Sequence, residues 1–120
     1  MASVTGNPAG QLEVEVQRRE PHAVVRVRGS AGMGDAEYLT SQLERLVEST
    51  GGVVVLDLAE LTFISSAGLG ALIRAHAKMH EGAGQIRLVH PQPFVRQVLK
   101  MTCLDRLFVI YASLDDALQV

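Results

Sequence analysis

The chain has 120 residues, a formal net charge of -2, one cysteine and no tryptophan. This length fits one domain with one hydrophobic core, and the slightly negative charge argues against nucleic acid as a partner. A single cysteine excludes an internal disulfide and a multi-cysteine metal site. No apolar run approaches the roughly 20 residues that span a bilayer, and the N-terminus has no secretory signal. We therefore expect a cytoplasmic protein without direct membrane contact.

The N-terminal segment is small, polar and without periodicity. It predicts a flexible tail over residues 1–10, ahead of a single domain that spans residues 11–120. Apolar and polar residues alternate over residues 12–17, which predicts a half-buried strand. After a turn at Pro21, residues 23–28 predict a second strand. The two strands should form an antiparallel hairpin.

The middle of the chain shows one helical stripe and one fully apolar strand. Residues 29–34 are rich in glycine and predict a flexible loop, after which Asp35 opens a helix with apolar residues on one face. Residues 53–58, VVVLDL, are nearly all β-branched or apolar, which is typical of a central strand covered on both faces. Residues 59–64 are predicted to form a loop.

The C-terminal half alternates helices with strands. The predicted elements are a helix at 66–80, a turn at 81–84, a strand at 85–90, a helix at 94–101, a strand at 107–111 and a helix at 114–118. The order ββαβαβαβα predicts an α/β domain with a mixed sheet. Its N-terminal hairpin is antiparallel, and its later strands run parallel, with right-handed crossovers and helices that cover them.

The stretch FISSAGLGAL, residues 63–72, places two serines and two glycines where a strand gives way to a helix. Each glycine weakens a helix by about 1 kcal/mol relative to alanine. Either Ser65 or Ser66 can be the N-cap of the helix. Alternatively, one serine is a phosphoacceptor, because the free N–H groups and partial positive charge of a helix N-terminus tolerate a phosphate. A phosphate of about -1.5 to -2 charges would switch binding off.

The predicted helix at 66–80 has two different faces when each residue is rotated by about 100°. The face toward the sheet carries Leu69, Leu72, Ile73, His76 and Met79. The opposite face carries Ala67, Ala71, Arg74 and Lys78, with Ser66 and Gly70 on the flank. The outer surface of the first two turns is therefore nearly bare, which lets the backbone of another protein approach closely.

Two pairs of polar residues have the spacing of reactive sites. His76 and His80 stand four residues apart, as in a two-histidine metal pair, but no third ligand is evident, which favours a core or flanking role for His76. Asp57 and Glu60 could form a carboxylate pair, but loop hydrogen bonding by Asp57 is favoured because no catalytic set can be assembled around them. We expect no enzyme activity, no metal and no cofactor.

Two further features have an ordinary interpretation. The glycine spacing of residues 29–34 loosely matches phosphate loops, but it lacks the lysine and serine or threonine of a nucleotide-binding loop. Cys103 has no charged neighbours that would lower the pKa of its thiol, so we expect it to be packed.

The segment VVVLDLAELTFISSAGLGALI, residues 53–73, resembles the STAS domain of anti-sigma-factor antagonists, also called anti-anti-sigma factors. The downstream patterns IRLVHP, VLKMTCLDRLFVI and SLDDAL strengthen this resemblance, which covers about residues 11–119. It implies the ββαβαβαβα fold. It also implies that the unphosphorylated chain binds an anti-sigma factor, usually a serine kinase of the histidine-kinase-like ATPase superfamily, and so releases a sigma factor. A serine phosphatase is a further implied partner.

Carried over residue by residue, the resemblance implies phosphorylation at Ser66, with Ser65 as the second candidate. We expect the partner-binding surface to comprise Ser65, Ser66, Ala67, Gly70, Ala71, Arg74 and Asp35. The family often has aspartate where Ser65 stands and the sequence GELD where residues 29–32 read GSAG, so Asp35 would supply the acidic group. The family also often has a glycine where Cys103 stands. The alternative is a scaffold or accessory subunit, without a switch, of a stress-signalling complex or a lipid-transport ATPase.

Overall fold

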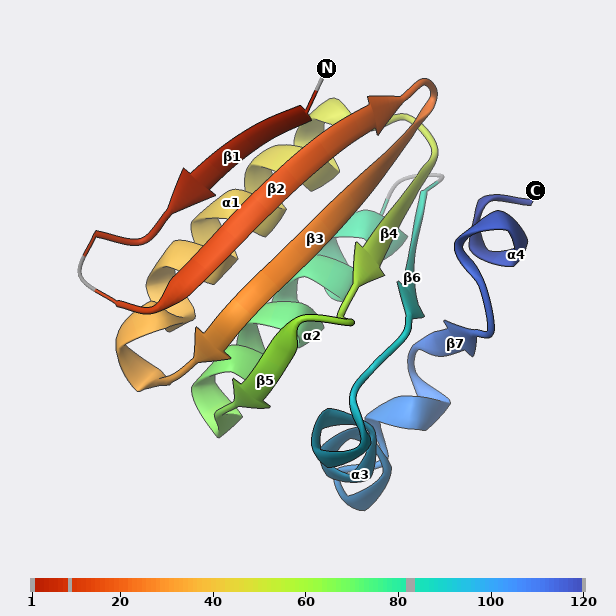
Figure 1. Ribbon diagram of the computed structural model, residues 1–120. Helices are drawn as coiled ribbons and strands as arrows, with labels where there is room; N and C mark the ends of the chain where they lie inside the picture. The colour runs from red at the N-terminus through yellow and green to blue at the C-terminus, as the bar shows by residue number, and fades with distance from the viewer. Residues whose placement is uncertain (1, 9, 82–83, 120) are drawn as a thin grey trace.

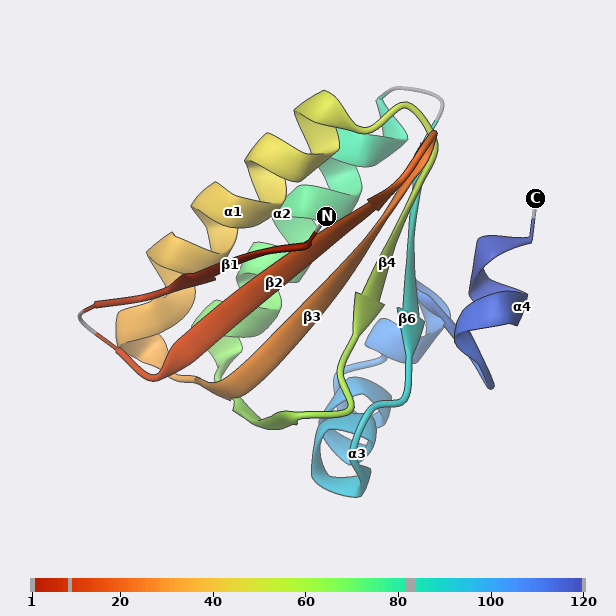
Figure 2. The ribbon, with the colours of Figure 1, turned by 45° about the horizontal axis from the view of Figure 1, so that its top comes forward.

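The computed structural model describes residues 2–8, 10–81 and 84–119. Its elements are β1 (Ala2–Gly6), β2 (Leu12–Arg19), β3 (His22–Ala31), η1 (Met33–Asp35), α1 (Ala36–Ser49), β4 (Val53–Asp57), β5 (Leu61–Ile64), α2 (Ser66–His80), β6 (Gln85–Val89), α3 (Pro93–Met101), η2 (Leu104–Arg106), β7 (Val109–Tyr111) and α4 (Leu114–Leu118). The strands form one mixed sheet in the order β1-β2-β3-β4-β6-β7, and β5 pairs with β3. Helices α1 and α2 lie side by side against one face of this sheet (Figures 1 and 2).

The predicted N-terminal hairpin is confirmed. β2 and β3 pair antiparallel, with Val14 opposite Val27 and Val16 opposite Val25. From β3 onward the strands β3, β4, β6 and β7 run parallel, as expected for strands that are joined by helical crossovers. The predicted α/β fold with its mixed sheet is therefore confirmed.

The prediction of a flexible tail is wrong for residues 2–6, which form β1 and pair antiparallel with β2. Residues 3–6 are exposed, so β1 is held through its backbone along the edge of β2 rather than by burial. Tyr38 of α1 adds a hydrogen bond, from its hydroxyl to Thr5 Oγ1 at 2.6 Å. Sequence periodicity reports burial, and a strand held in this way leaves no such pattern.

Residues 61–64, predicted to lie in a loop, form β5, which pairs in parallel with the end of β3. Leu61 and Ile64 are buried whereas Thr62 and Phe63 are exposed, so the segment lacks the alternation of an ordinary strand. With β1 and β5 included, the order becomes βββαββαβαβα.

The four predicted helices are confirmed as α1 to α4. The last predicted strand, at 107–111, is shorter than expected because the chain first forms η2, and the Phe108 N–H donates to the Leu104 carbonyl at 2.9 Å. The turn predicted at 81–84 includes residues 82 and 83, which lie outside the described part of the chain.

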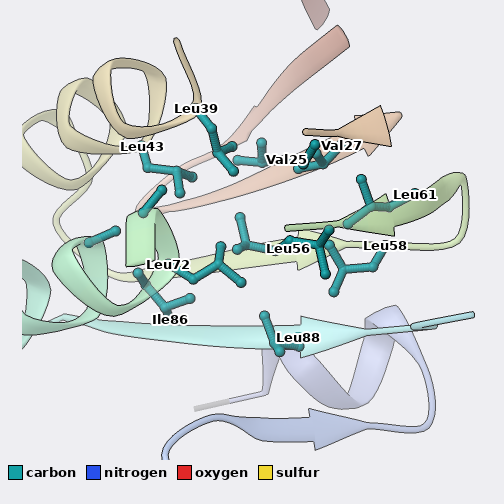
Figure 3. Close-up of a cluster of buried hydrophobic side chains, with 14 of the residues drawn as sticks. Val25, Val27, Leu39, Leu43, Leu56, Leu58, Leu61, Leu72, Ile86 and Leu88 are labelled. Carbon is teal, nitrogen blue, oxygen red and sulfur yellow. The ribbon is translucent and has the colours of Figure 1, made fainter. Parts of the chain in front are cut away.

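The main core lies between the sheet and the helices α1 and α2 (Figure 3). Leu43 of α1, Leu56 of β4 and Leu72 of α2 are fully or almost fully buried there, and burial of each contributes roughly 1.5–3 kcal/mol. Val53 and Val55 point to the other face of β4, where α4 covers them. β4 is therefore a central strand covered on both faces, as predicted.

Candidate functional site

Ser65 is the residue that caps α2. Its side-chain Oγ accepts a hydrogen bond from the Gly68 N–H at 3.1 Å, and its backbone is extended. Its own N–H donates to the Ala31 carbonyl at 2.8 Å, which fixes the start of α2 to the end of β3. β5, which directly precedes Ser65, also pairs with the end of β3 at this point, so the start of α2 is held against a strand that lies far earlier in the sequence.

Ser66 is the first residue of α2 and is exposed. No hydrogen bond joins its hydroxyl to any other residue in the described part of the chain. The two neighbouring serines therefore have different roles, since one hydroxyl stabilises the helix and the other faces solvent. The sequence left open whether Ser65 or Ser66 is the N-cap of α2, and the structure shows that it is Ser65.

The two glycines of the motif also differ. A Cβ atom at Gly68 would lie 2.9 Å from Ile64 Cγ1 and 3.3 Å from the Ala31 carbonyl oxygen, so this position needs glycine for the close approach of α2 to β3. At Gly70 the nearest group would be the end of the flexible Arg74 side chain, at 3.5 Å. Gly70 therefore serves no packing requirement, and the flank of α2 beyond Ser66 is covered there only by the end of the Arg74 side chain.

Large apolar side chains lie exposed on η1, β5 and α3, and η1 and β5 both lie next to α2. Phe63 of β5 and Phe94 of α3 are 41% and 49% exposed, and their rings stack with centroids 5.9 Å apart. Met33 of η1, two residues beyond Ala31, is 77% exposed. Clusters of this kind mark interaction surfaces more often than single exposed residues do. We call Met33, Phe63, Ser66, Gly70 and Phe94 the switch surface.

The apolar members of the switch surface were not predicted from the sequence. Phe63 and Met33 fall in segments that were expected to be loops, where no periodicity separates inside from outside. The available signal was the presence of bulky apolar residues immediately beside the serine–glycine motif.

Asp35 was predicted to lie on the partner-binding surface, and its buried position is a correction. The side chain is 5% exposed. Its Oδ1 accepts hydrogen bonds from Asn7 Nδ2 at 2.7 Å and from the Gln11 N–H at 3.2 Å. The carboxylate therefore anchors the connection between β1 and β2 onto η1, and is not presented to a partner.

Two positions on α2 are also corrected. Ala71 was predicted to lie on the outer face but is fully buried, because α1 covers this side of α2. Ile73 was predicted to face the sheet but is 42% exposed. The helix α2 is therefore covered on two sides, by the sheet and by α1. Its exposed surface is narrower than that of a helix covered by the sheet alone.

The remaining predicted residues of α2 lie at or near the surface. Ala67 is half-buried and Arg74 is exposed, with its guanidinium donating to Thr40 Oγ1 of α1 at 3.1 Å. Lys78 lies 2.6 Å from Glu48 Oε1. The hydrogen bond and the opposite charges of this pair raise the pKa of Lys78 and lower the pKa of Glu48. The two basic residues that were predicted on the outer face of this helix therefore both contact α1.

The other candidate sites have structural explanations. Asp57 Oδ1 accepts from the Ala59 N–H at 3.1 Å, which confirms its role in the loop, and Glu60 pairs with Arg28 at 3.1 Å. His76 packs against the Phe108 ring edge-on, with centroids 5.1 Å apart, and the His80 side chain lies outside the described part. Within the described residues, no group of three or more histidine, cysteine or acidic side chains could hold a metal ion.

The predictions for Cys103 and for the glycine-rich loop are wrong. Cys103 is exposed rather than packed, and it adopts φ +62 one residue beyond Thr102, the C-cap of α3. Residues 29–31 continue β3 instead of forming a flexible loop, and η1 follows from Met33. Among the described residues, no helix is long and apolar enough to cross a membrane.

The sequence model of the STAS domain family matches residues 13–117. This span includes the hairpin, β4, the motif at the start of α2 and α4. The chain belongs to the STAS domain family.

Related STAS proteins match over nearly the same length. BtrV of Bordetella bronchiseptica, a candidate anti-sigma factor antagonist, is 30% identical over 106 residues, covering 88% of this chain and 91% of BtrV. The crystal structure of an anti-sigma factor antagonist from Mycobacterium paratuberculosis has a TM-score of 0.80 and 30% identity, covering 95% of this STAS domain and 96% of that chain. The unphosphorylated form of the anti-sigma factor antagonist SpoIIAA shares the fold at a TM-score of 0.74 and 19% identity, covering 87% and 91%.

Proposed function

We propose that this protein is a cytoplasmic anti-sigma factor antagonist that binds its anti-sigma factor through the switch surface. In this proposal the partner is also a serine kinase, and phosphorylation of Ser66 ends the binding. The observation that carries the proposal is the division of roles between the two serines, because Ser65 caps α2 and leaves the Ser66 hydroxyl exposed. The names of BtrV and of the Mycobacterium protein support the choice of partner.

The fold can accept a phosphate at Ser66. The kinase would transfer the terminal phosphoryl group of ATP to Ser66 Oγ, which loses its proton while ADP leaves. Ser66 is the first residue of a 15-residue helix. The free N–H groups and partial positive charge of a helix N-terminus favour a nearby anion. A serine phosphatase would restore the binding form by hydrolysis.

The partner, in contrast, could not accept the phosphate. In this proposal the exposed side chains of Phe63, Phe94 and Met33 would be buried on docking. Gly70 adds no Cβ and allows the partner's backbone to approach. A phosphate in the middle of this contact would lose its water without a counter-charge, which costs several kcal/mol. Since each 1.4 kcal/mol is tenfold in affinity, binding would be lost.

The test is phosphorylation with the cognate anti-sigma factor and ATP, followed by peptide mass spectrometry of the modified site. We expect one phosphate on Ser66 in the wild-type chain and in Ser65→Ala. Ser66→Ala should bind the anti-sigma factor but acquire no phosphate and stay bound in the presence of ATP. Phosphate on Ser65, or an unphosphorylated wild-type chain that stays bound with ATP present, would contradict the proposed switch and favour a permanent scaffold.

A further inference from the structure

A charged surface separate from the switch surface lies at the opposite edge of the sheet from β1. Arg96 and Lys100 of α3 and Arg106 of η2 are exposed, and with Asp105 they line a cavity of about 490 Å³. In the described part of the chain, none of these four side chains forms an ion pair or a side-chain hydrogen bond. The local charge is +2, three cations less one carboxylate, on a chain whose net charge is -2.

The same cavity borders an open strand edge. Residues 108–110 complete its lining, and β7 is the last strand of the sheet. β7 pairs with β6 on one side, from Val109 opposite Arg87 to Tyr111 opposite Val89. No described strand pairs with its other side, and an edge strand of this kind can pair with another chain through its unpaired N–H and carbonyl groups.

The two faces of β7 differ in character. Ile110 packs against the main core, on the face that also buries Val95 and Leu99 of α3. Val109 is 52% exposed and Tyr111 packs against the cluster on the other face. Because successive side chains of a strand point to opposite faces, a strand added beside β7 would present every second side chain toward the α3 face, and the others beside Val109.

We propose that this basic edge, consisting of β7 with Arg96, Lys100 and Arg106, binds an extended acidic segment of a partner protein by strand addition. The segment pairs with the backbone of β7, places carboxylates toward the three cations and packs apolar side chains beside Val109. Strand addition supplies affinity through backbone hydrogen bonds and specificity through alternate side chains. The surface does not include Ser66 or the other residues of the switch surface, so it does not rest on the proposed switch.

The charges decide between the possible occupants. A second copy docked edge to edge through β7 would bring its own three cations against these three, and like charges across an interface are unfavourable. An anionic membrane would leave the outward backbone groups of β7 without hydrogen-bond partners. An acidic peptide satisfies both the cations and the strand edge.

The experiment is a titration of the ¹⁵N-labelled protein with the capped peptide Glu-Val-Glu-Val-Glu-Val, followed by amide chemical shifts. We expect saturable shifts within residues 96–111 and a dissociation constant of about 1 mM or tighter. The capped peptide Lys-Val-Lys-Val-Lys-Val should not bind. Absence of saturable shifts with the acidic peptide, or shifts confined to other elements, would overturn the proposal.

Matched charge reversals separate this surface from a general charge effect. Arg96→Glu combined with Lys100→Glu should weaken the acidic peptide at least about tenfold, and the weakening should shrink at high salt. Arg19→Glu combined with Arg45→Glu changes the net charge equally at exposed positions of β2 and α1, and should leave binding unchanged. Equal weakening by both pairs would overturn the proposal. The proposal would also be overturned if the amide shifts of residues 96–111 changed with phosphatidylglycerol vesicles, or on dilution of the protein alone, and did not change with the peptide.

Discussion

The Gly68 N–H donates a hydrogen bond to Ser65 Oγ at 3.1 Å, and this contact assigns the two serines of the motif to different tasks. Ser65 completes the first turn of α2, whereas Ser66 remains exposed. A modification at Ser66 can therefore change the surface of the domain without removing the contact that holds the helix in place.

The cap predicts unequal effects of two alanine substitutions. Ser65→Ala removes the acceptor for the Gly68 N–H and should lower the free energy of unfolding by about 1 kcal/mol. Ser66→Ala removes an exposed hydroxyl and should change it by no more than about 0.5 kcal/mol. Urea denaturation followed by circular dichroism measures both. Equal losses for the two variants would show that the cap is not formed by Ser65.

The glycines should respond in opposite directions. Gly68→Ala places a Cβ against Ile64 and Ala31, and such overpacking costs roughly 1–3 kcal/mol of stability. Gly70→Ala meets only the end of a flexible side chain, so the better helix propensity of alanine should stabilise the fold by up to about 1 kcal/mol. The same Gly70→Ala variant should weaken binding to the anti-sigma factor. Denaturation that finds Gly68→Ala the more stable of the two contradicts the packing described for α2.

Cys103 predicts a stabilising substitution. It adopts φ +62 at the end of α3, where helices commonly place glycine. Because a side chain is disfavoured in this left-handed conformation by roughly 1–2 kcal/mol, Cys103→Gly should raise the melting temperature. Cys103→Ala is the control, since it removes the thiol but keeps a Cβ. A melting temperature for Cys103→Gly no higher than that of Cys103→Ala would be inconsistent with the observed backbone.

The pair formed by Lys78 and Glu48 predicts a pH dependence of stability. The lowered pKa of Glu48 means that its contribution is present above the ordinary carboxyl pKa and is lost as the pH falls through the folded value. The raised pKa of Lys78 means that its contribution is present below the ordinary ammonium pKa and is lost as the pH rises through the folded value. The pair therefore stabilises the fold most between about pH 5 and pH 10.

The comparison that measures this effect is the wild-type chain against Glu48→Gln. The difference in unfolding free energy should be small, because Glu48 is exposed and Lys78 is partly exposed, and it should disappear as the pH falls through the lowered pKa of Glu48 or in about 1 M salt. Denaturant titrations at these conditions would show it. A difference that persists unchanged at low pH would mean that the variant acts through something other than the ion pair.

Most of the fold could be predicted from the sequence because burial leaves a periodic pattern. The alternation of residues 12–17 and the continuous apolar run VVVLDL both gave the correct strand type. β1 and β5 could not be predicted in this way, since β1 is held by its backbone and β5 buries only its two end residues. Strand pairing depends on which edge is free, and that is a property of the assembled sheet.

The site was predictable only in part for a similar reason. The motif identified the two serines, but their different roles depend on where α2 begins relative to β3. The burial of Ala71 follows from the packing of α1, and that of Asp35 from its hydrogen bonds to residues 7 and 11. These contacts join segments that are more than 20 residues apart, so no local pattern records them.

The most direct test of the account is calorimetric titration of the cognate anti-sigma factor with Ser66→Asp and Ser65→Asp. The two variants carry the same added charge one residue apart. Aspartate at position 65 can still cap α2, so Ser65→Asp should bind within about threefold of the wild-type chain, whereas Ser66→Asp should bind at least about 100-fold more weakly, as expected for a carboxylate desolvated without a counter-charge. Wild-type affinity in Ser66→Asp, or an equal loss in both variants, would contradict the central claim.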